Sequence, residues 1–255
     1  MCDVAGCGIG QNLWSMSDTA VPVERIGVVG CGLMGSGIAE VCARAGLDVM
    51  VREVDEAAAE RGRARLVKSL DRGLSAGKMS ETDRDSAVAN LHFTTEIGDL
   101  ADRQLLVEAV VEDAAMKVDI FRQLDRVVTA DDAILASNTS SIPIMKLGTA
   151  TDRPEQVIGI HFFNPVPVLN LVELVTSLMT NDETTARSDA FATDVLHKRV
   201  IRSQDRAGFV VNALLIPYLL SAIRMMESGF ASADDIDTGM VEGCSHPMGP
   251  LRLTD

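Results

Sequence analysis

The glycine-rich hexapeptide GCGLMG, residues 30–35, limits the possible folds of this chain more than any other feature. It follows a short apolar run at residues 25–29 and opens a segment of helical spacing, after which residues 47–53 form a second apolar run ending in Glu53. Glycines let a backbone approach a pyrophosphate, and the start of a helix supplies N–H groups that have no partner in the helix. A carboxylate at the end of the second run is placed to accept from an adenosine ribose. The sequence therefore predicts a dinucleotide site at Gly30, Gly32, Leu33, Met34, Gly35 and Glu53.

The chain beyond this unit continues to alternate apolar runs with helical spacing. Strands are predicted at residues 91–95, 105–111 and 133–137, and helices at residues 56–74 and 114–128. Such alternation is typical of a parallel sheet covered by helices on both faces. After a polar stretch at residues 202–206, which we interpret as a linker, the pattern turns helical and stays so. We therefore predict an α/β fold in three parts: a loose extension at residues 1–23, a doubly wound dinucleotide-binding domain at residues 24–205, and a helical domain at residues 206–255.

Composition argues against several classes of partner. The 37 acidic and 23 basic residues give a net charge of −14, which repels nucleic acid and anionic lipid. The first 24 residues contain no Lys or Arg, and the longest apolar stretch, residues 209–223, is interrupted by Asn212 and Pro217. Neither a signal peptide nor a membrane span is expected from these features, so we predict a cytoplasmic protein. Five cysteines, an odd number at spacings unlike those of a metal site, indicate reduced thiols and no metal.

Two polar residues stand in apolar runs on either side of a proline-rich turn. His161 lies near the end of a strand predicted at residues 156–163, and Glu173 lies within LNLVELV, residues 169–175. The two residues are equally far from Pro167, so an antiparallel hairpin would place them opposite one another. A buried carboxylate needs a charged or donating partner, and an imidazole paired with it is suited to general base catalysis. A purely structural His–Glu pair, or a strand exposed on one face, fits the same spacing.

A set of motifs occurs in an order and at spacings that resemble those of a known family. The motifs are GLMGSGIA, VVED, SNTSS, HFFNPVPV, LVELV, AGFVVNALLIPYLLSAI, DDIDTGM and HPMGPLRLTD. From about Arg25 to Asp255 the chain resembles the L-3-hydroxyacyl-CoA dehydrogenases, in their short bacterial 3-hydroxybutyryl-CoA dehydrogenase form. The resemblance implies a Rossmann-type domain followed by a smaller all-α dimerising domain, and therefore a homodimer. It also implies hydride transfer between an L-3-hydroxyacyl-CoA and a nicotinamide cofactor, giving the 3-ketoacyl-CoA.

The resemblance further implies roles for single residues. His161 matches the catalytic base and Glu173 its partner. The residues that match ligands of the reacting substrate oxygen are Ser140 and Asn212. Those that match contacts on the cofactor side are Glu112, Lys117 and Asn164. For the CoA moiety the sequence offers a basic segment with Ser69, Arg72 and Lys78, and this signal is weaker than the motifs.

Some alternatives stay open at this point. Glu53 favours NAD because an acid disfavours the 2′-phosphate of NADP, but the neighbouring Arg52 leaves NADP open. A 6-phosphogluconate or 3-hydroxyisobutyrate type of dehydrogenase would share the fold but would need a catalytic lysine in place of the His–Glu pair. A non-enzymatic, crystallin-like role also fits the composition. Because the family continues beyond the motif that ends at Asp255, we expect the helical domain to be truncated.

Overall fold

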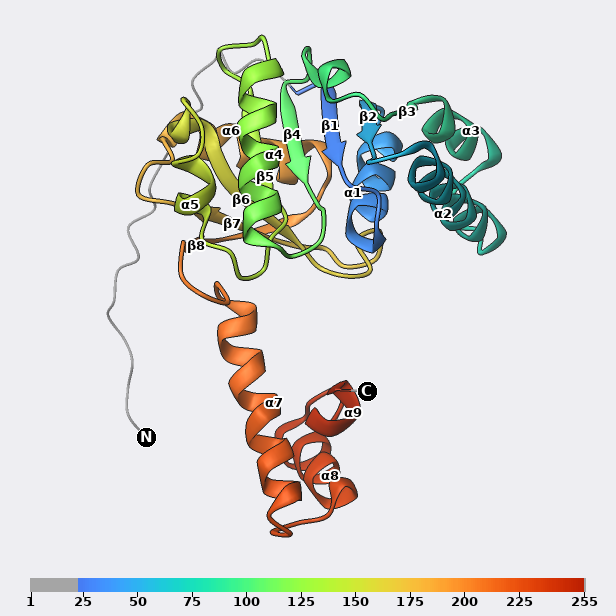
Figure 1. Cartoon of the computed structure of the whole chain (residues 1–255). Helices are drawn as coiled ribbons and strands as arrows, with labels where there is room; N and C mark the ends of the chain where they lie inside the picture. Colours follow the sequence, from blue (N-terminus) through green and yellow to red (C-terminus); the bar gives the residue numbers. More distant parts are fainter. Residues whose placement is uncertain (1–22, 255) are drawn as a thin grey trace, which may run out of the picture.

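The computed structural model describes residues 23–254, so the predicted loose extension at residues 1–23 lies outside the described part except for Val23 (Figure 1). The strands form one sheet in the order β3-β2-β1-β4-β5-β6-β7-β8. The first six run parallel, β7 is antiparallel to β6, and β8 is parallel to β7. The strands are β1 (Arg25–Val29), β2 (Asp48–Arg52), β3 (Leu91–Thr94), β4 (Leu105–Glu108), β5 (Ile134–Ser137), β6 (Val157–Phe162), β7 (Leu171–Thr176) and β8 (Arg199–Gln204).

Helices cover both faces of this sheet, which confirms the predicted α/β class. On one face the strands share a core with Ile38 of α1 and Leu66 of α2, and on the other with Phe121 of α4 and Leu147 of α5. The helices up to β8 are α1 (Leu33–Arg44), α2 (Glu56–Ser75), α3 (Glu81–Ala89), α4 (Ala114–Val127), α5 (Ile144–Gly148) and α6 (Asp182–Ala190). Short turns of helix are η1 (Ile97–Leu100), η2 (Pro154–Gln156) and the π-helical η3 (Phe191–Val195). We call the part from β1 to β8 the sheet unit.

Among the segments that differ from the sequence-based expectation, three have a clear local cause. Helix α3 was not expected, because its side chains are polar and only Ala87 is buried; it is fixed by a capping box between Ser80 and Asp83. Strand β4 is shorter than the apolar run at residues 105–111, since the amide of Val110 donates to the Glu108 carboxylate instead of to a neighbouring strand. The predicted linker at residues 202–206 begins inside β8, which pairs with β7 through Gln204.

After β8 the chain continues as α7 (Val211–Glu227), α8 (Ala233–Cys244) and α9 (Pro250–Thr254), which we call the helical unit. Figure 1 shows α7 extending away from the sheet unit, with α8 and α9 packed against its far half. The side chains of these three helices that are buried belong to Ala222, Ile236 and Pro250. Within the described residues, no helix is both long and apolar enough to cross a membrane.

Candidate active site

The glycine loop after β1 has the geometry that a close approach to a phosphate requires. Gly30 has φ +90°, and a Cβ there would meet the carbonyl of Ala109 at 3.0 Å. A Cβ on Gly35 would lie 1.8 Å from the carbonyl oxygen of Gly30, so the turn into α1 closes only with glycine. A Cβ on Gly32 would have nothing within 4 Å, because this residue faces open space. Two glycines therefore build the turn, and the third leaves its outer side free for a pyrophosphate at the start of α1.

Glu53 follows β2 and supports the same loop. Its Oε1 accepts a hydrogen bond of 2.5 Å from the amide of Cys31, and its Oε2 accepts from the amide of Val54. Arg52, the residue that leaves NADP open in the sequence, donates from Nε to the carbonyl of Thr95 at 3.2 Å. The carboxylate thus stands at the loop, while the neighbouring arginine is engaged with the backbone after β3.

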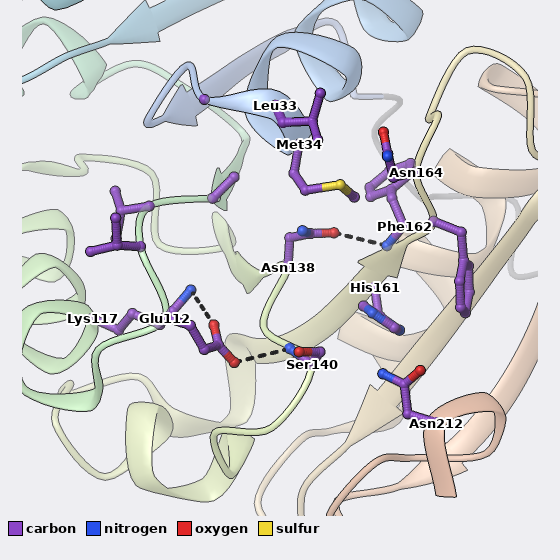
Figure 2. A pocket seen from close by; sticks show the side chains of 15 residues that line it. Leu33, Met34, Glu112, Lys117, Asn138, Ser140, His161, Phe162, Asn164 and Asn212 are labelled. Atoms are coloured by element: carbon purple, nitrogen blue, oxygen red, sulfur yellow. Dashed lines mark hydrogen bonds and ion pairs between the residues drawn. The ribbon is translucent and has the colours of Figure 1, made fainter. Parts of the chain in front are cut away.

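A cavity of about 470 Å³ opens where β1, β4, β5 and β6 end and α7 begins. In parallel α/β sheets ligands bind at this edge, outside the carboxyl ends of the strands. Figure 2 shows the polar side chains converging on the cavity from several elements. It is lined by Gly32, Leu33, Met34, Ala109, Val110, Val111, Glu112, Lys117, Asn138, Ser140, His161, Phe162, Phe163, Asn164 and Asn212.

The predicted hairpin of β6 and β7 is confirmed, with His161 directly opposite Glu173. Nδ1 of His161 lies 2.7 Å from Oε2 of Glu173, and the Glu173 side chain is fully buried. The rings of Phe163 and Phe209 lie 4.7 Å and 5.5 Å from the imidazole, centroid to centroid. The carboxylate and the two rings fix the orientation of the imidazole, and Nε2 is the nitrogen left for a ligand in the cavity.

The second oxygen of Glu173 links the hairpin to the helical unit. Oε1 accepts from the amides of Val210 and Val211 at 3.1 Å and 2.9 Å, at the start of α7. Burial raises the pKa of Glu173, but the hydrogen bonds from His161 and from the Val211 amide outweigh it and hold the pKa below its ordinary value. One charged carboxylate therefore orients the histidine and anchors the helix that brings Asn212 to the cavity.

A second charged group lies on the wall formed after β4. Lys117 is almost fully buried, and its Nζ lies 2.7 Å from Oε1 of Glu108 and 3.2 Å from Oε2 of Glu112. Burial raises the pKa of Glu112, yet the hydroxyls of Thr139 and Ser141 and the charge of Lys117 lower it to about 2. Oε1 of Glu112 also accepts from the amide of Ser140 at 3.2 Å. The three residues predicted here from the resemblance, Glu112, Lys117 and Ser140, thus form one connected group (Figure 2).

Most of the predicted site residues line this one cavity, whereas Gly30, Gly35, Glu53 and Glu173 do not, and neither do the residues proposed for the CoA moiety. Ser69 is a half-buried residue of α2, and Lys78 is an exposed residue of the loop before α3. Lys78 borders a smaller cavity together with Arg44 and Asn90. The basic face that suggested these residues is exposed, as most charged helical faces are.

Two residues at the site were not singled out in the sequence. Asn138, after β5, accepts from the amide of Phe162 at 2.8 Å and lines the cavity beside Ser140. Glu108, the last residue of β4, is fully buried beneath the cavity wall. The signal for Glu108 was the same as for Glu173, a lone carboxylate in an apolar strand, here within LLVEAVV.

Within residues 23–254 there is no group of three or more His, Cys, Asp or Glu side chains that could hold a metal ion. Of the cysteines, Cys31 and Cys42 are buried free thiols and Cys244 is an exposed one. Burial first, and then the charge of Glu53, raise the pKa of Cys31 to about 12, so this thiol within the glycine loop stays neutral.

Comparison with known proteins agrees with this geometry. Residues 25–206 match the family model described as the NAD-binding domain of 3-hydroxyacyl-CoA dehydrogenase, and residues 208–255 match the model of its C-terminal domain. A 3-hydroxybutyryl-CoA dehydrogenase of Mycobacterium tuberculosis is 62% identical over 240 residues, which cover 94% of this chain and 83% of that protein. A probable 3-hydroxybutyryl-CoA dehydrogenase of Deinococcus radiodurans is 44% identical, covering 91% and 82%.

Solved structures show the same relationship. The crystal structure of FadB2 from M. tuberculosis superposes with a TM-score of 0.90 at 62% identity and covers 91% of this chain and 82% of that one. The (S)-3-hydroxybutyryl-CoA dehydrogenase PaaH1 from Ralstonia eutropha gives a TM-score of 0.87 at 43% identity, covering 91% and 81%. The family predicted from the motifs is confirmed: the chain, with its NAD-binding sheet unit, belongs to the 3-hydroxyacyl-CoA dehydrogenases.

Proposed function

We propose that this chain interconverts L-3-hydroxyacyl-CoA and 3-ketoacyl-CoA with NAD, and that its substrate is the short-chain thioester 3-hydroxybutyryl-CoA. The observation that carries the proposal is the pair of His161 and Glu173, 2.7 Å apart, in which His161 lines a cavity that the glycine loop also lines. The names of the relatives in M. tuberculosis and D. radiodurans support the short acyl chain.

His161 is the proton carrier in this proposal. Bound NAD supplies the chemistry of hydride acceptance from carbon C3. A secondary alcohol is too weak an acid to lose its proton unaided near neutral pH, so hydride loss has to be coupled to proton removal. Nε2 of His161 takes the proton of the C3 hydroxyl, and the negative charge of Glu173 stabilises the imidazolium that results. In the reverse direction the same nitrogen returns the proton to the oxygen of the ketone.

Ser140 and Asn212 hold the reacting oxygen in this proposal. Both side chains line the cavity with His161, and Figure 2 shows the amide of Asn212 pointing toward the imidazole. A donor placed at an oxygen that gains negative charge contributes about 3 kcal/mol to the stability of the transition state. The two residues come from different units, Ser140 from the loop after β5 and Asn212 from α7.

The residues of the dinucleotide side fit NAD. The open side of Gly32 and the free amides at the start of α1 suit the pyrophosphate, and Leu33 and Met34 line the same cavity. Glu53 stands after β2, where a carboxylate accepts from a ribose hydroxyl and disfavours a 2′-phosphate. Glu112, Lys117 and Asn164 complete the cofactor side of the proposal.

Steady-state rates test the substrate and the cofactor together. Acetoacetyl-CoA and a series of longer 3-ketoacyl-CoA thioesters are reduced with NADH and, in parallel, with NADPH. The proposal expects the highest kcat/KM for acetoacetyl-CoA with NADH. It also expects poor turnover of free 3-hydroxybutyrate, because the CoA moiety supplies binding energy remote from the reacting carbon. Equal kcat/KM for the free acid and its thioester would contradict the assignment.

We also propose that the protein is a cytoplasmic homodimer joined through the helical unit. The large apolar side chains exposed on α7 and on the turn after it support this, namely Leu214, Ile216, Leu220, Met225, Met226 and Phe230. An apolar surface of this kind is typical of a surface that another chain covers. Light scattering of the parent protein and of Leu214→Asp tests this proposal. The parent should have twice the chain mass, and the variant should have a lower mass. A parent protein of single-chain mass would contradict it.

A further inference from the structure

Glu108 is a buried carboxylate that takes no part in the proposed reaction. It is the last residue of β4, and its side chain has 0% exposure. It does not line the cavity, so it touches neither the cofactor nor the substrate of the proposed function. A buried charge is costly unless it is paired and fully hydrogen-bonded, so its partners indicate what it does.

Four hydrogen bonds from three residues satisfy this carboxylate. Nζ of Lys117, on α4, donates to both oxygens at 2.7 Å and 3.0 Å. The hydroxyl of Ser137, at the end of β5, donates at 2.6 Å, and the amide of Val110 donates at 2.7 Å. Two of these partners, Lys117 and Val110, line the cavity, and Ser137 directly precedes the lining residue Asn138. Glu108 therefore joins the ends of two neighbouring strands to the first turn of α4.

The lysine carries this connection to the surface of the cavity. Its ammonium group lies between two carboxylates: the buried one of Glu108, at 2.7 Å, and that of Glu112 on the cavity wall, at 3.2 Å. The Lys117 side chain is 1% exposed, whereas that of Glu112 is 38% exposed. A partly exposed glutamate has other rotamers available in water. The fixed cation of Lys117 favours the rotamer of Glu112 in which the two groups pair.

Glu112 in turn holds the turn that carries Ser140. Its Oε1 accepts from the hydroxyl of Thr139 at 2.5 Å, from the amides of Ser140 and Ser141 at 3.2 Å each, and from the hydroxyl of Ser141 at 2.8 Å. This oxygen thus accepts from the amides of both Ser140 and Ser141, and the Ser141 amide also donates to the hydroxyl oxygen of Thr139 at 3.3 Å. If Glu112 turned away, the backbone at Ser140 would lose its support, and the hydroxyl beside His161 would move.

We propose that Glu108 is a positioning residue, which fixes Lys117 and, through Glu112, the place of Ser140 in the active site. The inference rests on the proposed function only for the role of Ser140 as a substrate ligand. The chain of contacts from Glu108 to the turn exists without cofactor or substrate, so it can be tested on the apoprotein. A failure of the proposed activity and a failure of this inference are therefore distinguishable.

Hydrogen exchange of the apoprotein is the first test. In Glu108→Gln, amide exchange in the segment 138–142 should become at least about tenfold faster, because the support of the two amides by Glu112 is loosened. The matched control is Glu40→Gln, which changes another buried glutamate of the sheet unit, 3% exposed, that does not line the cavity. The control should leave exchange in this segment unchanged. Lys117→Met breaks the same chain of contacts at its next member and should accelerate the same segment, which keeps the test valid if Glu108→Gln does not fold.

Kinetics give the second test, through a double-mutant cycle with Ser140→Ala. If Glu108 acts through Ser140, Glu108→Gln should lower kcat about tenfold in the parent and less than about threefold in the Ser140→Ala background, since coupled residues are not additive. A purely structural role for Glu108 would lower kcat by the same factor in both backgrounds, and that result would overturn the proposal. Unchanged exchange of segment 138–142 in both folded Glu108→Gln and Lys117→Met would overturn it as well.

Discussion

The sheet unit and the helical unit bury their side chains in very different ways. In the sheet unit both faces of the sheet are closed by helices, and the strands β1, β4, β5, β6 and β7 are almost entirely buried. Among the described residues of α7, α8 and α9, the buried side chains are those of Ala222, Ile236 and Pro250, whereas large apolar side chains such as Leu214 and Phe230 are exposed. The first unit is thus a completed core, whereas the second presents an apolar surface of the kind that other chains cover.

The active site divides between the two units in the same unequal way. Of the described residues that line the cavity, only Asn212 comes from the helical unit. That residue is held in place by Glu173, which accepts from the first amides of α7 with one oxygen and pairs with His161 through the other. A unit with a closed core thus supplies the rigid part of the site, and a single carboxylate connects it to the unit that completes the site. The four substitutions below test this division, beginning with the largest effect.

His161→Gln should have the largest effect and should affect only chemistry in the sheet unit. Glutamine keeps a polar side chain but cannot act as a general base, so kcat should fall about a thousandfold. The dissociation constant of NADH, measured by fluorescence titration, should stay within a few-fold of that of the parent. The idea is abandoned if kcat of a folded variant stays within a few-fold of the parent value.

Gly32→Val should act on the cofactor side of the same unit. A Cβ at Gly32 meets no atom within 4 Å, so the protein alone tolerates the side chain, which occupies the space of the pyrophosphate. The dissociation constant of NADH should rise about a hundredfold, which corresponds to about 2.8 kcal/mol of binding free energy. Gly98→Val is the matched control, since Gly98 has open space around its Cβ but does not line the cavity. Equal NADH affinity in the Gly32 variant and in the control would remove the glycine loop from the cofactor site.

Glu173→Gln tests the connection between the units and should have an intermediate effect. The amide keeps the shape and one acceptor but loses the charge, so kcat should fall about tenfold, the cost of one hydrogen bond to a charged group. The negative charge of Glu173 stabilises the imidazolium form of His161, and the substitution removes that charge. The acidic limb of the pH–rate profile for oxidation should therefore move to lower pH. Exchange of the amides of Val210 and Val211 should also become faster. A shift of the limb to higher pH would break the proposed pairing and leave His161 as the base.

These tests concern features that the sequence revealed to different degrees. The hairpin that pairs His161 with Glu173 was predictable because two buried polar residues at equal distance from one turn leave a single favourable register. Glu112 and Lys117 were assigned from the resemblance alone, and no pattern in the sequence indicated that the same carboxylate would hold the turn of Ser140. Contacts between loops that follow different strands depend on the register of the whole sheet, which has no local signature.

The secondary structure that was missed has physical reasons too. Helix α3 buries only Ala87, so its sequence shows no apolar period, although the capping box of Ser80 and Asp83 was visible as a start signal. Strand β8 alternates partly buried with exposed residues such as Arg199 and Arg202, as a strand at the edge of a sheet often does. Both segments lie where the core needs few side chains, and there the apolar pattern carries little information.

The smallest expected effect is the contribution of Glu112 to the stability of the sheet unit in acid. In the folded protein its pKa is lowered from 4.5 to about 2, so folding favours the charged form. A carboxyl with a lowered pKa stabilises the fold fully above its unfolded value and loses this contribution as the pH falls through its folded value. The difference in unfolding free energy between the parent and Glu112→Gln, from urea denaturation, should therefore shrink between about pH 5 and pH 2. Because the group is partly exposed, the difference should stay below about 1 kcal/mol. Thr139→Val removes one donor to the carboxylate and should reduce the pH-dependent part; a difference that is constant across this range would mean that the turn of Ser140 does not depend on the charge of Glu112.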